Sequence, residues 1–246
     1  MIQSELPGDR KPSQTGFGQK GVSSVRSRQI EVYKQQLALT APQREMLVGL
    51  LLGDACLETQ NRGRTYRLKI EHSIAQAQYV QHLYEAFREW VLCGPRLKSQ
   101  RVAGKTYQKL WFNTVSHGAF RFYAQQFYRN GTKVVPKLLH RLLTARGLAY
   151  WFMDDGSIKS KQSKGVLFNT QRFSEPDVAR LIGVLQGKFG LEAKRRRQPE
   201  GQQIYISGRS YERFRALVEP YLIPQMRYKL PSERIRRPNL TELPKE

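Results

Sequence analysis

The sequence predicts an α+β fold built from two similar halves, each an αββαββα unit around an antiparallel sheet. Three observations predict this fold. Strand-like stretches alternate polar and apolar residues, helix-like stretches repeat apolar residues every three or four positions, and the same order of elements occurs twice in 246 residues. Such a repeat relates the two sheets by a pseudo-twofold axis. The alternative is a chance repetition in a chain of mixed composition.

The first half of the repeat begins with a helix. Thr40 is a favoured N-cap residue, and Pro42 fits the first helical turn. Residues 65–71 alternate apolar and charged side chains, which indicates a strand, and residues 73–92 have helical spacing that ends at Gly94. The half is completed by two strands near 96–102 and 106–114 and by a helix at 117–129.

The second half repeats this order. Ser174 is expected to cap a helix, with Asp177 three residues on as an imperfect capping box. The other elements are an apolar helix at 142–154, strands near 165–171, 191–198 and 202–207, and a helix at 209–222. The chain accordingly divides into a flexible basic arm at 1–28, two subdomains at 29–137 and 138–231, and a polar basic tail at 232–246.

The charge of the chain indicates a polyanionic partner. Lys and Arg number 42 against 20 Asp and Glu, a formal net charge of +22. Residues 1–137 carry 21 basic and 9 acidic residues, and residues 138–246 carry 21 and 11, so both halves are basic. A membrane-spanning segment is excluded because the longest apolar run, Met46–Leu52, is far too short to cross a bilayer, and charge spread over both halves is unlike a single basic helix on a membrane surface. Nucleic acid is therefore the expected partner.

Several other classes of protein lack support. The sequence has no P-loop, no evident Ser/His/Asp or Cys/His set, and no apolar run of a signal peptide in residues 1–20. Cys56 and Cys93 make neither a disulfide framework nor a zinc set, and we expect both to be buried thiols.

The polar side chains of the predicted strands are candidates for DNA contact. An antiparallel sheet can bury one face and expose the other. Arg and Lys match guanine edges, Asn and Gln match adenine, and carboxylates match cytosine, so a mixture of these types favours base reading. An ordinary solvated face is the alternative. The candidates are Arg67, Lys69, Glu71, Lys98, Lys109, Asn113, Asn169, Gln171, Glu192, Lys194 and Arg196.

Two nearly all-apolar helices each end in an aspartate, Asp54 and Asp155. A helix C-terminus carries partial negative charge, so an aspartate there is unfavourable unless a positive charge compensates it. A hard divalent cation held by carboxylate and carbonyl oxygens would supply that charge, whereas a simple turn is the alternative for each residue. Gly49 and Gly53 lie four residues apart on one helix face, which lets another backbone approach closely.

Both segments, Leu47–Ala55 and Leu148–Gly156, resemble the nine-residue LAGLIDADG motif. Their aspartates are 101 residues apart, as in the single-chain, two-motif homing endonucleases. The stretches 220–226 and 228–231 are also similar to intron-encoded members of that family from yeast mitochondria. The resemblance covers roughly residues 30–231 and departs from the family pattern at Tyr150 and Asp154, where small residues are usual.

The resemblance implies a monomeric endonuclease that cuts double-stranded DNA. Such an enzyme hydrolyses both strands of a long, weakly symmetric site with Mg²⁺ and leaves short 3′ overhangs. Mn²⁺ is a plausible substitute, and Ca²⁺ is expected to support binding without cleavage. The motif helices would pack at the centre, with the two sheets forming a DNA-binding saddle. An organellar location, in a mitochondrion or chloroplast, is also implied.

The resemblance further assigns roles to single residues. Asp54 and Asp155 would bind the metal, with the backbone carbonyls of Gly53 and Asp154 as additional ligands. Lys133 and Lys229 would organise water and stabilise phosphate charge, although both could instead be surface residues near a proline turn. Two alternatives share the scaffold: a maturase that splices a group I intron RNA, and a DNA-binding regulator without cleavage.

Overall fold

The computed structural model describes residues 28–231 and divides the chain into two compact units, 1–37 and 38–246. The first unit contributes one helix, at 28–35. All other elements described below belong to the second unit. The predicted arm and tail fall outside the described residues, except for residue 28.

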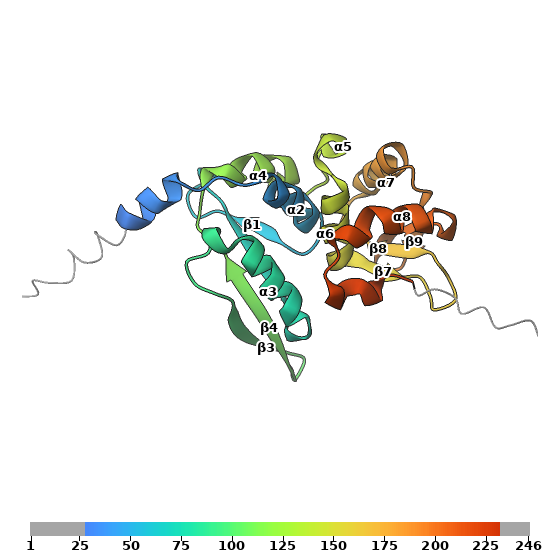
Figure 1. The fold of residues 1–246 in the computed structure, drawn as a ribbon, viewed down its shortest axis with the longest axis horizontal. Helices are drawn as coiled ribbons and strands as arrows, with labels where there is room; N and C mark the ends of the chain where they lie inside the picture. Colours follow the sequence, from blue (N-terminus) through green and yellow to red (C-terminus); the bar gives the residue numbers. More distant parts are fainter. Residues whose placement is uncertain (1–27, 232–246) are drawn as a thin grey trace, which may run out of the picture. The chain divides into compact units, whose positions relative to one another are not determined.

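The first half of the second unit contains one four-stranded antiparallel sheet in the order β1-β2-β4-β3, of which β1, β3 and β4 are labelled in Figure 1. Its register pairs Lys69 with Asn113 and Lys98 with Lys109. The elements are α2 (Ala41–Leu52), β1 (Cys56–Glu58), β2 (Arg67–Ser73), α3 (Ala77–Ala86), β3 (Arg96–Val102), β4 (Lys105–Asn113) and α4 (Arg121–Phe127).

The second half contains an equivalent sheet in the order β7-β8-β10-β9. The elements are α6 (Ala145–Asp155), β7 (Gly156–Ile158), β8 (Val166–Asn169), α7 (Glu175–Phe189), β9 (Ala193–Gln198), β10 (Gly201–Ile206) and α8 (Tyr211–Val218). Both halves therefore have the predicted αββαββα order, and the α+β fold with two antiparallel sheets is confirmed. Strands β1 and β7, three residues each, are too short for an alternating pattern to locate them.

Several shorter elements depart from the sequence prediction. The helices expected at 73–92 and 209–222 are wrong as single helices, because each is an α-helix flanked by 3-10 turns. Pro220 lies at the start of one such turn, where its missing N–H prevents the α-helix from continuing. The additional elements are α5 (Leu139–Leu142), the hairpin of β5 (Tyr128–Arg129) and β6 (Thr132–Lys133), and a 3-10 helix at Pro224–Lys229.

Helix caps occur where the sequence predicts them. The Thr40 hydroxyl accepts from the backbone N–H of Gln43 at 3.3 Å, and the Gln43 side chain accepts from the Thr40 N–H at 3.0 Å. These two bonds form a complete capping box at the start of α2. The Ser174 hydroxyl accepts from the Asp177 N–H at 3.4 Å, so that Ser174 caps the start of α7.

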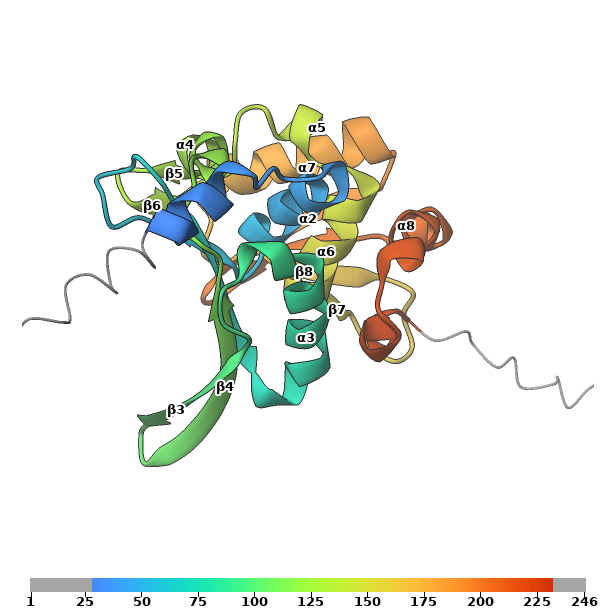
Figure 2. The same ribbon diagram turned by 60° about the vertical axis from the view of Figure 1, so that its left-hand side comes forward.

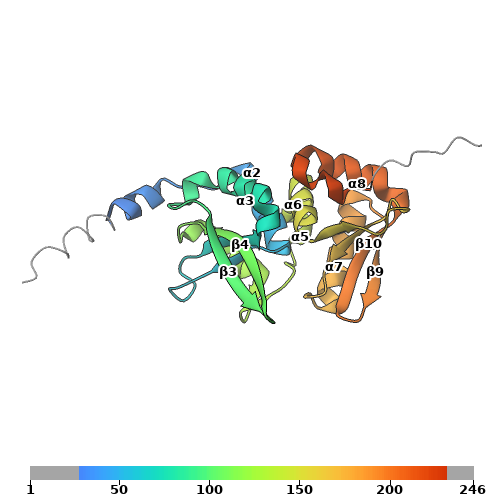
Figure 3. The same cartoon turned by 90° about the horizontal axis from the view of Figure 1, so that it is seen from below.

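Helices α2 and α6 pack against each other between the two sheets (Figures 1 and 3). They approach each other closely at Gly49 and Gly147, since a Cβ added at Gly49 would lie 2.1 Å from the Gly147 carbonyl oxygen. Both helices are buried along most of their length. The predicted close approach at Gly49 therefore exists, and the aspartates at the two helix ends are brought together.

The sheets bury one face beneath helices and leave the other open. Strands β3 and β4 extend beyond the rest of their sheet as a two-stranded ribbon (Figure 2), and β3 is exposed along its whole length. Among residues 28–231, no helix combines the length and the apolar character needed to cross a bilayer. Cys56 is half-buried and Cys93 is exposed, so the expectation of two buried thiols is wrong for Cys93, which lies just before β3.

Candidate active site

The two motif aspartates lie at adjacent helix ends around one arginine. Asp54 lies in the turn that follows α2, and Asp155 is the last residue of α6. The Arg172 guanidinium is 3.8 Å from a carboxylate oxygen of Asp54 and 3.4 Å from one of Asp155. The sequence did not single out Arg172, which follows β8 in a turn, because only the tertiary fold brings that turn to the helix ends.

The two carboxylates differ in exposure. The side chain of Asp54 is 47% exposed and that of Asp155 is 10% exposed. The indole N–H of Trp151 donates to Asp155 at 3.2 Å. Burial raises the pKa of Asp155 to about 7, although Arg172 acts in the opposite direction. A buried carboxylate with a raised pKa favours a cation that would stabilise its charge.

Asp154 contributes more than the backbone carbonyl that the sequence assigned to it. Its side chain is completely buried, and it accepts from the Asp54 N–H at 3.0 Å and from the Tyr79 hydroxyl at 2.8 Å. Burial and the nearby Asp54 charge raise the pKa of Asp154 to about 7. Gly53 leaves room for this carboxylate, because a Cβ there would lie 2.1 Å from its oxygen.

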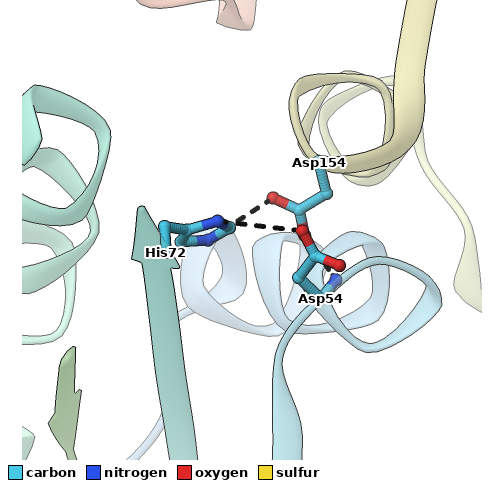
Figure 4. Close-up of side chains that lie close together, drawn as sticks. All are labelled: Asp54, His72 and Asp154. Carbon is cyan, nitrogen blue, oxygen red and sulfur yellow. Dashed lines mark hydrogen bonds and ion pairs between the residues drawn. The ribbon is translucent and has the colours of Figure 1, made fainter. Parts of the chain in front are cut away.

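His72 completes a cluster with these two aspartates (Figure 4). One ring nitrogen, Nδ1, is 3.7 Å from Asp54, and the other, Nε2, is 3.8 Å from Asp154. Burial lowers the pKa of His72 although the Asp54 charge opposes this shift. The sequence signal was present, because His72 is two residues after the inward-facing Ile70 of β2, but the strand prediction ended one residue earlier.

Lys133 and Lys229 occupy equivalent positions beside the two helix ends. The ammonium of Lys133 donates to the carbonyls of Gly53 at 2.9 Å and Ala55 at 2.7 Å. The ammonium of Lys229 donates to the carbonyls of Met153 and Asp154. Burial lowers the pKa of both lysines, that of Lys133 to about 8. Neither side chain extends into solvent, which is unlike a surface lysine at a proline turn.

The donor set fits a hard divalent cation. Three carboxylates, Asp54, Asp154 and Asp155, lie at the two helix ends, and carboxylate oxygen is the ligand that Mg²⁺ prefers. The carbonyls of Gly53 and Asp154, which the sequence assigned as additional ligands, already accept from Lys133 and Lys229. The side-chain oxygens therefore have more open lone pairs than these carbonyls.

The first sheet brings six charged side chains together on its open face. Glu58 and Glu71 pair with the four basic candidates at 2.8 to 3.9 Å, and Glu58 was not predicted. Asn113 lies opposite Lys69 on the same face, and its buried side-chain oxygen has no hydrogen-bond partner among the described residues. The four basic candidates are Arg67, Lys69, Lys98 and Lys109.

The second sheet presents its predicted basic residues differently. Lys194 and Arg196 are exposed, and within the described residues neither has an ion pair. Asn169 lies on the same face and accepts from Gln203, which the sequence did not single out, at 2.7 Å. Gln171 lies in the turn after β8 rather than in a strand, and Glu192 precedes β9.

The chain is similar to DNA endonucleases and to a maturase. Residues 44–214 match the LAGLIDADG DNA endonuclease family. A protein named "Probable intron-encoded endonuclease 1" from Wickerhamomyces canadensis is 34% identical over 211 residues, which cover 83% of this chain and 90% of that protein. The cytochrome b mRNA maturase bI2 of Saccharomyces cerevisiae is 30% identical over 198 residues, covering 75% of this chain and 46% of the maturase.

A solved structure agrees with the fold over nearly the whole chain. The homing endonuclease I-WcaI bound to its DNA recognition sequence has a TM-score of 0.78 and 32% sequence identity. The alignment covers 87% of this chain and 95% of that one.

Proposed function

Since the chain belongs to the LAGLIDADG DNA endonuclease family, we propose that it is a site-specific homing endonuclease that hydrolyses both strands of double-stranded DNA with Mg²⁺. The observation that carries the proposal is the pair of acid-terminated helices, α2 and α6, packed together between two sheets with polar open faces. A DNA-binding protein without cleavage has no need for buried carboxylates at this position.

In this mechanism Asp54 and Asp155 would hold the cation. When bound, Mg²⁺ supplies the Lewis acid that stabilises charge on the phosphodiester and lowers the pKa of attacking water. Arg172, which contacts both carboxylates, holds them in place and offsets part of their repulsion in the metal-free chain.

The two lysines would assist at either helix end. Each ammonium donates two of its three N–H groups to backbone carbonyls, which leaves one to donate to a phosphate oxygen or to orient water. Because burial lowers the pKa of Lys133 to about 8, its Nζ can also exchange a proton with water near neutral pH. We therefore assign Lys133 and Lys229 a role in positioning water and phosphate, and Lys133 a proton-transfer role as well.

DNA recognition would use the open faces of both sheets as a saddle. The predicted contact residues lie on those faces or at the adjoining turn, with Glu58 and Gln203 as additions. A long, weakly symmetric target, short 3′ overhangs, a monomeric enzyme and an organellar location follow from the family resemblance and belong to the same proposal.

A maturase is the second candidate, because maturase bI2 aligns with three quarters of this chain. Group I intron RNA would then be a partner in addition to DNA. A cleavage-inactive regulator is disfavoured by the presence of both carboxylates and both lysines at the helix ends.

The test is to incubate the chain with a randomised duplex library and Mg²⁺ and then to sequence all cut ends. The proposal predicts defined double-strand breaks at one long site, with short 3′ overhangs. Cutting at random positions, or no cutting in Mg²⁺ or Mn²⁺, would contradict it. Binding confined to structured intron RNA would favour the maturase.

A further inference from the structure

We propose that His72 and the side chain of Asp154 join Asp54 in one mixed nitrogen–oxygen site that takes a first-row transition cation, with Mn²⁺ as its probe. This inference depends on the proposed function only in that both assign Asp54 as a metal ligand. The three residues come from β2 and from the ends of α2 and α6. Figure 4 shows the imidazole facing both carboxylates.

The spacing of the three side chains suits a single cation. One ligand atom from each residue lies within 4.8 Å of the other two. A cation bound at about 2.1 Å keeps its ligand atoms within about 4.2 Å of one another, so the side chains need to close by only about 0.6 Å.

The buried imidazole gives a second, independent reason. The His72 side chain is 3% exposed, and its Nε2 has no hydrogen-bond partner among the described residues. A buried polar atom without a partner carries a desolvation cost, which a metal ligand bond would remove. Nε2 is 3.8 Å from Asp154, on the side where the cation would lie.

The surroundings also resemble the outer contacts of a metal site. The Tyr79 hydroxyl donates to Asp154, and the Tyr79 ring lies 5.1 Å from the imidazole, centroid to centroid. Such outer groups fix the orientation of ligand side chains. Imidazole nitrogen favours transition cations over Mg²⁺, which binds oxygen ligands.

The second half cannot build the same site. Gly53 stands where Asp154 stands in the other motif, and it has no side chain. The strand registers show which residue corresponds to His72. Lys69 and Leu167 are equivalent, because each pairs with the second residue after a motif aspartate. Three residues further along the chain from each, Thr170 is therefore the equivalent of His72. Thr170 is buried and donates to the Gln202 carbonyl at 2.6 Å. Within residues 28–231, the mixed site beside Asp54 therefore has no counterpart beside Asp155.

Pulsed electron paramagnetic resonance of the full chain with one equivalent of Mn²⁺ tests the site. The wild-type spectrum should show ¹⁴N modulation from an imidazole ligand, and labelling the histidines with ¹⁵N should replace it. His72→Asn should abolish the modulation and lower the Mn²⁺ affinity at least tenfold, measured by titration calorimetry. His82→Asn is the matched control, because His82 is a half-buried histidine that contacts the Tyr150 hydroxyl instead.

The labelled wild-type protein keeps the test valid even if His72→Asn does not fold. No nitrogen modulation in the wild type, or modulation that survives in folded His72→Asn, would overturn the inference. DNA cleavage in Mg²⁺ is measured separately on the unmodified chain. Cleavage without a His72 signal refutes only the mixed site, whereas a His72 signal without cleavage refutes only the proposed function.

Discussion

The two halves of the molecule have the same topology but unlike chemistry at their motif ends. In the first half, Asp54 is half-exposed and lies beside a buried histidine. In the second half, Asp155 is nearly buried and is held by Trp151 and Arg172. Asp154, whose counterpart is Gly53, crosses from the second half to the first and accepts the Asp54 N–H.

The repeat therefore preserves backbone positions more strictly than the surroundings of the side chains. The lysines and the aspartates keep equivalent positions because helix ends and sheet registers repeat. The groups around them are not repeated. In the first half a neighbour comes from β2, and in the second half one comes from the turn after β8. We therefore expect the two carboxylates to respond differently to pH, metal and mutation.

The largest expected effect concerns the centre that both halves share. Gly49→Leu would place side-chain atoms against the Gly147 backbone, which cannot move without separating α2 from α6. We expect a loss of about 3 kcal/mol in the free energy of unfolding, measured by urea denaturation. The control is Gly183→Ala in α7, where nothing lies within 4 Å of an added Cβ, and which should gain up to about 1 kcal/mol. If Gly49→Leu were as stable as the wild type, the two halves would not depend on this contact.

The next effect separates the two halves by pH. Burial raises the pKa of Asp155 to about 7 from an ordinary value of 3.8, so its charge destabilises the metal-free fold increasingly from pH 4 to 7. Asp155→Asn should therefore leave stability unchanged at pH 4 and raise it by about 1–3 kcal/mol at pH 8, measured by urea denaturation. Mg²⁺ should stabilise the wild type at pH 8 but not this variant.

Glu71 in the first half provides the opposite case. Burial alone would raise its pKa, but hydrogen bonding and charge from Lys109, with Lys98 and Lys69, lower it. The Glu71 carboxylate therefore stabilises the fold at pH values above the pKa that it has in the unfolded chain, and this stabilisation is lost as the pH falls. Glu71→Gln should consequently lower stability at pH 8. An Asp155→Asn variant that loses stability at pH 8 would contradict the contrast between the halves.

A smaller effect compares the two open sheet faces. Arg67 is already paired with Glu58 at 2.8 Å, whereas Arg196 is exposed and has no ion pair among the described residues. Arg196→Ala should weaken binding to the selected duplex about tenfold, and Arg67→Ala should weaken it about threefold. Fluorescence anisotropy across a salt series measures both, and Arg88→Ala, in the 3-10 turn that follows α3, is the control. Equal losses from both sheets would remove the proposed difference in recognition.

The smallest effect concerns the caps of the two motif helices. Thr40 has a reciprocal partner in Gln43, whereas the third residue of α6 is Gly147, which has no side chain to complete the box. Thr40→Ala should cost about 1 kcal/mol and Thr144→Ala about half of that, measured by thermal unfolding. A larger loss at Thr144 would show that the caps do not follow this difference.

Local sequence rules predicted much of the fold. The caps at Thr40 and Ser174 and the alternation along β2 depend on neighbouring residues, so they can be read directly. The three-residue strands β1 and β7 could not be located, because they form by pairing with β2 and β8 rather than by their own pattern.

The site was predicted less completely than the fold. The motif positions identified Asp54, Asp155 and the two lysines as candidates, and their roles remain predictions. Arg172 and Tyr79 were missed, since only tertiary packing brings the turn after β8 and helix α3 to the motif ends. The Asp154 side chain was missed as a contact because its partner is a backbone N–H of the other motif.

The most direct test of the account is strand-resolved cleavage of the selected duplex by the wild type, Asp54→Asn and Asp155→Asn. We predict that the wild type cuts both strands in Mg²⁺ and neither in Ca²⁺. Each variant should lose at least about a hundredfold in cleavage rate while its affinity for the duplex in Ca²⁺ stays within about threefold. Metal-independent cutting, or full activity in both variants, would contradict the assignment of these two carboxylates to the active site.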